Sequence, residues 1–565
     1  VYSALNRLFF EKEVAFDIET RGHTIISIAF SSGSNFAHVI PLDLLWLGAA
    51  GPETYDLLRR FFASHDGLIA QVGIFDILML LQHFPVKRLH FDTNVAHHTL
   101  YPELPHALDF LTSVYTRIPY FKWLAPSGET LFKRNAYDAV STFMIAQKEK
   151  EELAEYGLTD FFYGFVMPLW HCTFRMGLRG ILVDNKARGE LDRELEKEAD
   201  KLQAEFNRKT GQDLNVRSHT QMKTYLYETL KLPKQYHRVT YALTTDEDAL
   251  EKLAKKSPIV REILGVRKPL NLRSKLTKVQ LDDDNRARTQ YSQSVTDTGR
   301  LSSRKTLWRT GLNLQNVPRE VEKRRMFVAD PGFVLVAYDL AQAEVRLVAW
   351  FAKDERLKSF LLEGGDIHKW NASLIFNKEM DDIKPDERYF AKRIVHAFNY
   401  GLGPMHLVDL VRTEFGLEWA KSDATRVRES YFKNSPRILP WHEEIRVVMN
   451  TSRVLVNPFG RRRSFFSRSG DDLLRKMVAY LPQSTCVDCL DEGMVRVDLR
   501  LPEPAIHLLQ VHDEGVLECL PKQVEEIVGI IKEEFKQPIY IDGESMTIPV
   551  EVKVGPNWGE LKEIK

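Results

Sequence analysis

Two stretches decide how this chain folds: FVLVAYD at residues 333–339 and LLQVHDEGVLECL at residues 508–520. Each is an apolar run typical of a buried strand, and each carries an acid at its tip, Asp339 in the first and Asp513 in the second. An unpaired charge on a buried strand is costly. Two such acids brought together would form a site for two divalent cations, the usual device for in-line displacement at phosphorus.

The composition indicates a globular protein of several domains. The length of 565 residues suggests about three to four domains, and 44% hydrophobic with 28% charged residues is ordinary. No apolar run approaches about 18 residues, so we expect no membrane span. The four cysteines are too few for a disulfide scaffold and indicate a reducing compartment. We expect a cytoplasmic location, in the host cell if the chain is viral, with an organelle as the alternative.

Total charge does not indicate a nucleic-acid binder, because 78 Lys and Arg balance 78 Asp and Glu. The distribution is more informative. Basic residues cluster at 267–278, 323–325 and 461–463. Such a cluster is usually only a solvated face, but each one here flanks a predicted phosphate site, so we expect contacts with DNA.

The chain divides into three segments by pattern. About the first 150 residues alternate strands such as VAFDIET and TIISIAF with helices, which predicts an α/β domain. From about Leu158 to Asp297 the pattern changes to long amphipathic helices, one of which is predicted to end at Gly211. After Asp297 strands and helices mix.

The first segment holds a second group of acids. Asp17 and Glu19 stand two apart in VAFDIET, so on a strand they share a face. Asp76 follows in GIFDILML and Asp138 in RNAYDAVST. Surface acids are common, so each is a weak signal alone. Together the four would hold two metals that activate water and stabilise a departing 3′ oxygen.

The helix predicted after Pro385 carries a basic stripe. Pro385 suits a first helical position, and Gly401 and Pro404 are expected to end the helix. The residues that recur every four positions are Arg388, Lys392, His396 and Tyr400. They would share one face, where adjacent basic groups repel one another unless an anion such as a triphosphate binds. A solvated basic face is the alternative.

Seven segments after residue 296 carry a family resemblance. They are DTGRLSS (297–303), NLQNVP (313–318), YDLAQAEVR (338–346), GGDIHKW (364–370), AKRIVHAFNYG (391–401), LPQST (481–485) and VHDE (511–514). In this order and spacing they resemble the polymerase core of family A DNA polymerases, the group of bacterial DNA polymerase I and many phage replicases.

The N-terminal acids resemble the DEDD-type 3′–5′ exonuclease domain. Asp17 and Glu19 match its first motif, Asp76 its second and Asp138 its third, while Asp92 matches a segment that supplies no metal ligand. Two positions depart from the family pattern: Val72 stands where Asn is common, and Arg134 where a Tyr usually orients the attacking water. With all four acids present, the resemblance implies an active nuclease.

The implied fold is multidomain, α/β and α+β: a ribonuclease H-like exonuclease domain followed by a right-hand polymerase, with no 5′-nuclease domain. The expected boundaries are 1–155 for the exonuclease, 156–297 for a mostly helical thumb, 298–365 for the first part of the palm, 366–480 for the fingers and 481–565 for the second part of the palm.

The resemblance also implies roles for single residues. Asp339, Asp513 and the backbone carbonyl of Leu340 would hold two Mg²⁺ ions, with Glu514 as a nearby secondary acid. The four N-terminal acids would hold two more, and Mn²⁺ would substitute at both sites. Residues expected to contact the nucleotide are Leu340, Gln342, Glu344, His368, Arg388, Lys392, His396 and Tyr400. Residues expected to contact DNA are Arg300, Asn313, Gln315, Arg346, Gln483 and His512.

Three positions near the nucleotide set the expected chemistry. Glu344 occupies the family's steric gate, where a bulky acid excludes a ribose 2′-OH. His396, beside Lys392 on the catalytic stripe, stands where the family Lys is proposed to act as a general acid on pyrophosphate, and it would do so only if the triphosphate raised its pKa. Tyr400 rather than Phe implies weak discrimination against dideoxynucleotides.

The expected function is DNA-directed DNA synthesis from dNTPs on a primer-template, with 3′–5′ proofreading, in phage replication. Organellar or plasmid replication or repair is the alternative origin. A second hypothesis is a 3′–5′ exonuclease whose polymerase half clamps DNA, and a third is a non-catalytic DNA-binding scaffold; the retained acids argue against both. Expected partners are a helicase, a single-strand-binding protein and a processivity factor, with no membrane, around a monomer.

Overall fold

The computed structural model describes residues 2–42, 51–124 and 128–564. The N-terminal part is built on a five-stranded sheet of order β3-β2-β1-β4-β5. Its strands are β1 (Val14–Arg21), β2 (Thr24–Ser31), β3 (His38–Pro41), β4 (Leu68–Ala70) and β5 (Phe91–Asp92). β1 runs antiparallel to β2 and parallel to β4. The predicted α/β pattern is therefore confirmed.

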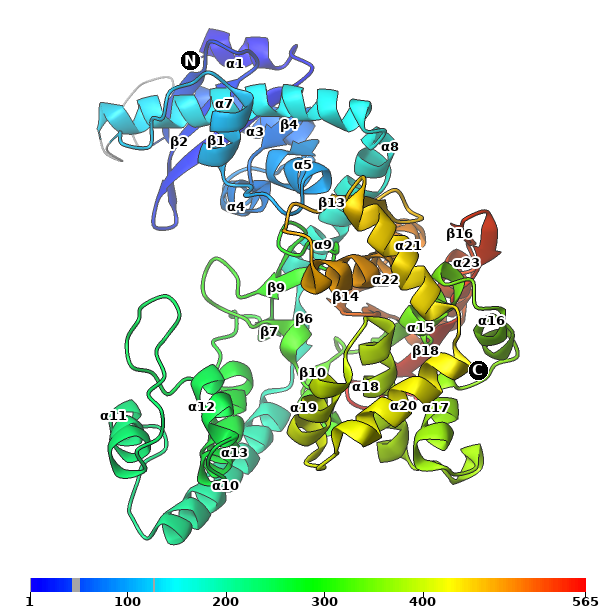
Figure 1. The fold of residues 1–565 in the computed structure, drawn as a ribbon. Coiled ribbons are helices and arrows are strands. Elements are labelled where there is room, and N and C mark those ends of the chain that lie inside the picture. Colours follow the sequence, from blue (N-terminus) through cyan, green and yellow to red (C-terminus); the bar gives the residue numbers. More distant parts are fainter. Residues whose placement is uncertain (1, 43–50, 125–127, 565) are drawn as a thin grey trace.

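Helices cover this N-terminal sheet. They are α1 (Tyr2–Leu8), α3 (Gly51–Ser64), α4 (Gly73–Leu80), α5 (Thr93–Leu100), α6 (Leu108–Tyr115) and α7 (Glu129–Glu155). The long α7 lies across β1 and β2 in Figure 1. Seven of the eight residues of β2 are buried, as expected for a strand packed on both faces.

A short connecting segment joins this domain to the rest. After α8 (Thr159–Phe161), the helix α9 (Met167–Arg179) leads into β6 (Ile181–Val183), which pairs with β7 (Arg286–Ala287) and β10 (Phe327–Val328). Residues 167–183 (α9 and β6) therefore lie with the base of the C-terminal half rather than in the helical arm. Residues 156–166 instead pack on the N-terminal domain, where the rings of Phe162 and Tyr163 contact Phe91 and His90. The predicted boundary at 156 placed both segments in that arm, because the sequence shows their helical pattern but not these contacts.

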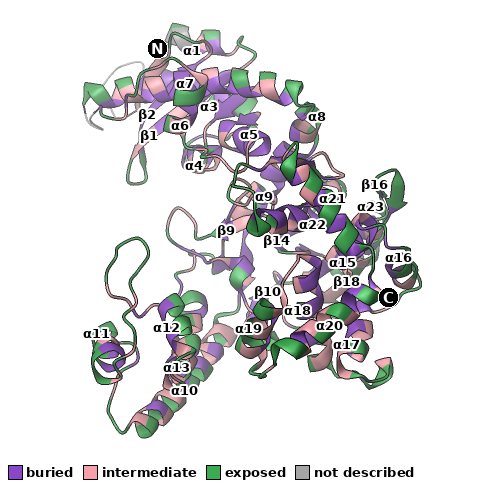
Figure 2. Ribbon diagram, viewed as in Figure 1, coloured by how far each residue is buried: buried purple, intermediate pink, exposed green. Residues whose placement is uncertain are grey.

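The helical arm contains α10 (Asn185–Thr210), α11 (His219–Lys223), α12 (Glu247–Ala254) and α13 (Ile259–Leu272). The Asp184 side chain accepts hydrogen bonds from two backbone amides in the first turn of α10. Gly211, at φ 66°, ends the helix, as predicted. The arm has its own apolar core, which includes Phe206, Leu226 and Ile263. It projects away from the rest of the molecule, and its outer surface is mostly exposed (Figures 1 and 2).

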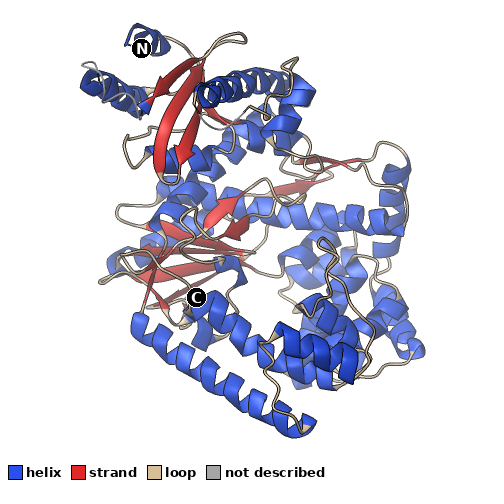
Figure 3. Ribbon diagram, turned by 90° about the vertical axis from the view of Figure 1, so that its left-hand side faces the viewer, coloured by secondary structure: helices blue, strands red, loops and turns tan. Residues whose placement is uncertain are grey.

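A second five-stranded sheet, visible in red in Figure 3, lies at the centre of the C-terminal half. Its order is β14-β15-β11-β18-β19, with bounds Ile506–Val511, Glu514–Cys519, Val334–Leu340, Val550–Gly555 and Lys562–Glu563. β11 runs antiparallel to β15 and β18. The register puts Asp339 opposite Glu514, so the two stretches that opened the sequence analysis are neighbouring strands.

Helices surround this sheet and form a lobe beside it. They are α14 (Val321–Arg324), α15 (Ala343–Phe351), α16 (Glu355–Leu362), α17 (Ile367–Phe376), α18 (Pro385–Asn399), α19 (Pro404–Phe415), α20 (Lys421–Asn434), α21 (Ile438–Asn450), α22 (Asp471–Arg500) and α23 (Val524–Glu534). Short strand pairs are β8 (Gln290–Ser292) with β9 (Ser302–Arg304), β12 (Val454–Val456) with β13 (Arg462–Ser464), and β16 (Ile539–Ile541) with β17 (Glu544–Met546). Within the described ranges, no helix has both the length and the apolar character that crossing a bilayer requires.

Candidate active site

The first candidate centre lies at the ends of β11 and β15, where Asp339, Asp513 and Glu514 meet. Burial, followed by the charges of Asp513 and Glu514, raises the pKa of Asp339 to about 7. Among the described residues, the buried Oδ1 atom of Asp339 has no hydrogen-bond partner. A buried carboxylate oxygen next to two other acids is destabilised when it is ionised, and a nearby positive charge would relieve this cost. These residues fit divalent cations, as predicted from the sequence.

The three acids differ in what holds them. Glu514 accepts from Arg324 at 3.1 Å and from the Trp558 indole at 3.2 Å. The Arg324 guanidinium also stacks on the Trp558 ring, 3.8 Å from its centroid. Among the described residues, the ion-pair partner of Asp513 is the exposed Arg319, at 3.2 Å. Glu514 is therefore fixed by protein partners, whereas Asp339 and Asp513 remain available to a ligand.

A buried polar cluster lies behind the turn that carries Asp513. Gln510 on β14 accepts from Gln315 at 2.9 Å and donates to the His512 carbonyl at 3.0 Å. The Tyr291 hydroxyl accepts from the Gln510 amide at 3.0 Å. His512 itself sits at φ 60°, a conformation that needs support in a residue other than Gly. Gln510 was not singled out from the sequence, although a polar residue inside an apolar strand was a usable signal.

The basic stripe of α18 lies on one face, but it is not bare of acids. Arg388 pairs with Asp366 at 2.7 Å, and His396 Nδ1 lies 3.2 Å from Glu344. Lys392 alone has no hydrogen-bond or ion-pair partner in the described part of the chain. Contrary to the prediction from the sequence, repulsion along the stripe therefore does not require a bound anion, because Asp366 and Glu344 already relieve it.

Glu344 is the hub of this region. Its carboxylate accepts from Arg300 and from the Tyr400 hydroxyl, both at 2.9 Å. Burial opposes its ionisation, but His396, Arg300 and Tyr400 together hold the pKa of Glu344 at about 2. Nearby, burial and the charges of the stripe lower the pKa of His368 to about 3. Glu344 is thus an anion, and His368 is neutral, at physiological pH.

The other predicted contact residues surround the same region. Gln342, at φ 53°, joins β11 to α17 by accepting from the Ile367 amide at 3.2 Å. Arg346 is 7% exposed and donates to the Ala341 carbonyl at 3.2 Å, so it braces the turn after β11. Leu340 ends β11.

Two predicted DNA contacts lie on other elements. The Asn313 side chain accepts a hydrogen bond from Ser303 at 2.5 Å, and Gln483 lies half-buried on α22. Their contacts with DNA or nucleotide stay predictions.

The four N-terminal acids form the second candidate centre. One ligand atom from each of Asp17, Glu19 and Asp138 lies within 4.8 Å of the others. Asp76 accepts from the Ile18 amide at 3.3 Å, and burial with the nearby acids raises its pKa to about 8. Burial, followed by Asp138, Asp76 and Glu19, raises the pKa of Asp17 well above its ordinary value. This crowding again fits divalent cations.

Two cations already lie among these acids. The Lys122 ammonium contacts Asp138 at 2.5 Å. Arg134, at the family's Tyr position, lies 3.7 Å from Glu19 and 3.9 Å from Asp138. Lys122 was not expected from the sequence, because it comes from a loop outside the recognised motifs. Part of the negative charge in this centre is therefore offset by protein side chains.

The other two notable positions of the nuclease motifs have structural roles. Val72, where the family often has Asn, adopts φ 57° at the start of α4. Asp92 accepts from the Val72 and Gly73 amides at 3.2 and 2.9 Å and from the Asn94 amide at 3.0 Å. It therefore caps two helices, and its absence from the metal ligands stays a prediction.

The three basic clusters turn much of their charge inward. Arg461 and Arg463 are 9% and 2% exposed. The main pairs are Arg273–Asp192, Arg324–Glu514, Arg461–Asp488 and Arg463–Glu103, at 2.8, 3.1, 2.7 and 2.8 Å. Acids distant in the sequence thus pair with these arginines, and their contacts with DNA stay a prediction.

Comparison with known proteins identifies the family. Residues 185–560 match the model of DNA polymerase family A. The chain belongs to family A. It is 32% identical over 412 residues to the thermostable DNA polymerase I of Thermus filiformis, covering 70% of this chain and 48% of that protein. It is 29% identical over 432 residues to the DNA polymerase I of Streptococcus pneumoniae serotype 4, covering 73% and 47%. The chain thus spans about half the length of the curated relatives it matches.

A solved structure shares the fold of this family A chain. It is the POL domain of Pol1 from M. smegmatis in complex with DNA primer-template and dNTP, with a TM-score of 0.80 and 21% identity. The match covers 99% of this chain and 98% of the other. The N-terminal part, which lies outside the matched family model, is therefore included in the shared fold.

Proposed function

We propose that this chain catalyses template-directed DNA synthesis, transferring a nucleotidyl group from a dNTP to a primer 3′-OH. The observation that carries the proposal is the pair Asp339 and Asp513, held at adjacent strand ends with the partnerless Oδ1 atom of Asp339 buried between acids. Support comes from membership of family A, from relatives named DNA polymerase I, and from a structural neighbour solved with primer-template and dNTP.

Asp339, Asp513 and the Leu340 carbonyl would hold two Mg²⁺ ions. When bound, such ions lower the pKa of an attacking hydroxyl and stabilise charge at phosphorus. The protein supplies the rest of the site. Lys392, which has no hydrogen-bond or ion-pair partner among the described residues, would bind the triphosphate. Arg388 would join it after release from Asp366.

The Glu344 hub would define the sugar pocket. The carboxylate is held by Arg300, His396 and Tyr400, so it cannot turn aside without breaking three contacts. A fixed acid at that position would exclude a ribose 2′-OH. His396 is placed to hold a proton between Glu344 and a bound phosphate.

The test is primer extension by Asp339→Asn. Loss of metal binding at phosphorus removes several kcal/mol of charge stabilisation, so we expect at least about a 1,000-fold lower rate of synthesis. Asp472→Asn, an exposed acid on α22, is the matched control and should extend normally. Extension by Asp339→Asn at the wild-type rate, with circular dichroism showing a folded protein, would refute the proposal.

A second activity, 3′–5′ degradation of DNA, is proposed for the N-terminal centre. The observation in its favour is the convergence of Asp17, Glu19 and Asp138 within 4.8 Å, with Asp76 beside them. Asp17→Asn should abolish degradation of single-stranded DNA while synthesis continues, and Asp56→Asn on the exposed side of α3 is the control. Equal loss of both activities in Asp17→Asn would contradict two independent centres.

The remaining expectations rest on the resemblance alone. We propose primer-template DNA and dNTPs as ligands, a monomer as the working form and phage replication as the setting. The helicase, single-strand-binding protein and processivity factor, and a location in a host cytoplasm, stay predictions.

A further inference from the structure

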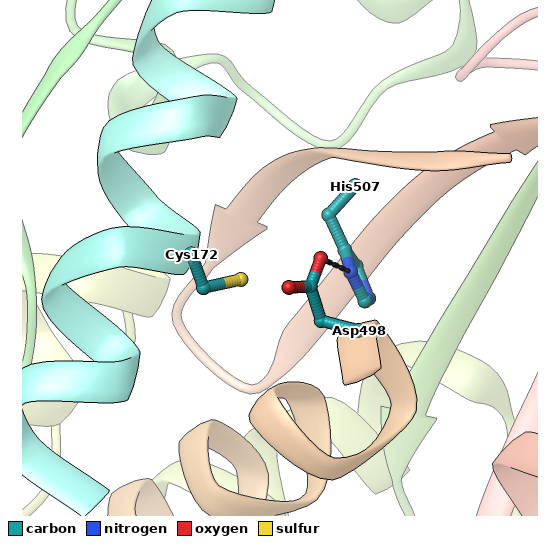
Figure 4. A group of neighbouring side chains, drawn as sticks. All are labelled: Cys172, Asp498 and His507. Carbon is teal, nitrogen blue, oxygen red and sulfur yellow. Dashed lines mark hydrogen bonds and ion pairs between the residues drawn. The ribbon is translucent and has the colours of Figure 1, made fainter. Parts of the chain in front are cut away.

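A cluster of three potential metal ligands lies away from both candidate centres (Figure 4). Cys172 comes from α9, Asp498 from the last turns of α22 and His507 from β14. One ligand atom from each lies within 4.8 Å of the other two. Cys172 and His507 are each 1% exposed, while the Asp498 side chain is 12% exposed. The cluster is therefore buried but open to solvent on the aspartate side.

The ligand types and spacing match a particular class of ion. Thiolate sulfur, imidazole nitrogen and carboxylate oxygen are the ligands that zinc uses in proteins. Two nitrogen or oxygen ligands about 2.0 Å from a tetrahedral ion lie roughly 3.3 Å apart. His507 Nδ1 and Asp498 Oδ1 are 3.2 Å apart. In Figure 4 the thiol and the imidazole both point toward the Asp498 carboxylate, from opposite sides.

The contacts around the cluster resemble the outer shell of a metal site. His507 Nε2 lies 2.9 Å from the Tyr338 hydroxyl, which leaves Nδ1 as the nitrogen that faces Asp498. Arg175 donates to Asp498 Oδ2. Metal-binding histidines commonly donate their other ring nitrogen, and ligating carboxylates are commonly hydrogen-bonded, in this way. The outer contacts thus orient two of the three ligands.

The charges of the three side chains also suit a divalent cation. A Cys172 thiolate and the Asp498 carboxylate would together neutralise a divalent ion, leaving Arg175 as the outer cation. Without an ion, burial and the neighbouring Asp498 carboxylate raise the pKa of the Cys172 thiol. Cysteine binds metal as the thiolate, so binding would release the thiol proton.

We propose that Cys172, Asp498 and His507 bind a zinc-class divalent ion, at a site independent of the acids that would bind Mg²⁺. The ion would join three elements that are distant in the sequence: α9, α22 and β14. Through the Tyr338–His507 contact it would also brace β11 next to Asp339. The proposed role is structural, because the three ligands come from three separate elements and none of them belongs to either candidate centre.

The test is a Co²⁺ titration of the metal-stripped full chain in a reductant without thiols. Cobalt bound to a thiolate gives a ligand-to-metal charge-transfer band in the near ultraviolet, whereas cobalt bound only to carboxylates gives none. The Mg²⁺-type centres therefore do not contribute to this signal. We expect a band that saturates at one ion per chain and is displaced by Zn²⁺.

Variants assign the band to its ligands. Cys172→Ser should abolish it, and His507→Gln should weaken binding at least about tenfold. Cys519→Ser, at another fully buried cysteine, is the matched control and should keep the band. A wild-type chain without the band, or a band that survives Cys172→Ser, would overturn the proposal and leave the three residues as a hydrogen-bonded cluster only.

Thermal unfolding gives a second readout that does not depend on cobalt. In an Asp17→Asn, Asp339→Asn background, Zn²⁺ should raise Tm, because an ion that binds only the folded chain stabilises it. The rise should be lost when Cys172→Ser is added and kept with Cys519→Ser. An equal rise in all three proteins would contradict the proposal even if each variant folds.

Discussion

The two candidate centres differ in how the negative charge of their acids is neutralised. At the end of β11, Asp339 has an orphaned carboxylate oxygen and a pKa of about 7, and the nearby cations bind other acids. In the N-terminal domain, Lys122 lies against Asp138 and Arg134 approaches Glu19. At the first centre the exposed Arg319 contacts Asp513 while Asp339 has no ion pair among the described residues, so an ion can reach Asp339 without displacing a protein cation. At the second centre an ion that binds Asp138 must displace Lys122.

The difference shows that matching acids do not make matching metal sites. Each set includes carboxylates that are largely removed from solvent, and burial is the largest cause of the raised pKa at Asp17 and at Asp339. What differs is the origin of the neutralising charge. We therefore expect synthesis to reach its maximal rate at a lower Mg²⁺ concentration than degradation does.

The largest expected effect concerns Glu344, an acid of the C-terminal half that two basic side chains, Arg300 and His396, contact. Glu344→Ala removes the carboxylate held by Arg300, His396 and Tyr400. If this acid excludes a 2′-OH, the ratio of kcat/KM for dNTP over NTP should fall about 100-fold. Single-turnover incorporation of matched dNTP and NTP measures that ratio.

Two further variants act as controls, and the first of them separates the size of the Glu344 side chain from its charge. Glu344→Gln keeps the size of the side chain, so it should retain most of the discrimination if bulk decides. Glu355→Ala, an exposed acid on α16, should leave the ratio unchanged. An unaltered ratio in Glu344→Ala would remove Glu344 from the sugar pocket.

The second effect tests Glu149, a buried acid that has no ion-pair partner among the described residues. Glu149 on α7 is 0% exposed, and neither carboxylate oxygen has a hydrogen-bond partner within the described residues. Burial, followed by Asp92, raises its pKa well above the ordinary value. The folded state therefore holds a proton that the unfolded state releases above about pH 4.3. Its stabilising contribution is full below that pH and is lost as pH rises toward the folded-state pKa.

Glu149→Gln should remove this dependence. We expect the variant to be more stable than wild type by about 2 kcal/mol at pH 7, with the difference shrinking toward pH 4. Urea unfolding at both pH values measures it, and Glu151→Gln, an exposed neighbour on α7, is the control. A difference that grows as pH falls would reverse the assigned sign.

Particular elements show what the sequence could predict. The helices at 185–210 and 385–399 were predictable, because their signals, Gly211 after one and Pro385 at the start of the other, are local. The acids of both centres were also predictable as sets. The countercharges were not, because Lys122 comes from a loop and Glu103 and Asp488 approach Arg463 and Arg461 only after folding. The sequence shows the sign of each charged side chain, but not which opposite charge the fold brings next to it.

The third effect tests the difference between the centres directly. Lys122→Met removes the ammonium that contacts Asp138 while keeping an unbranched side chain. We expect the N-terminal centre to bind Mn²⁺ about tenfold more tightly, consistent with the loss of one charge pair of about 1.4 kcal/mol. Calorimetry in an Asp339→Asn, Asp513→Asn background isolates this centre.

Lys148→Met is the matched control, because Lys148 pairs with Glu151 on the exposed part of α7. It should leave Mn²⁺ affinity unchanged. Weaker binding in Lys122→Met would show that Lys122 supports the ion rather than competes with it, and the contrast between the centres would no longer hold.

The smallest effect concerns the backbone of the N-terminal centre. Val72 adopts φ 57° just before α4, the helix that carries Asp76, and a left-handed conformation costs a β-branched residue roughly 1–2 kcal/mol. Asn tolerates this conformation, so Val72→Asn should raise the free energy of unfolding by about 1 kcal/mol. Val114→Asn, at an exposed position on α6, controls for the change of side chain and should not stabilise. Because Val72 is exposed, little packing is lost to mask the gain; an unchanged or lower stability would mean that the Asp92 caps, rather than the residue at 72, set the backbone here.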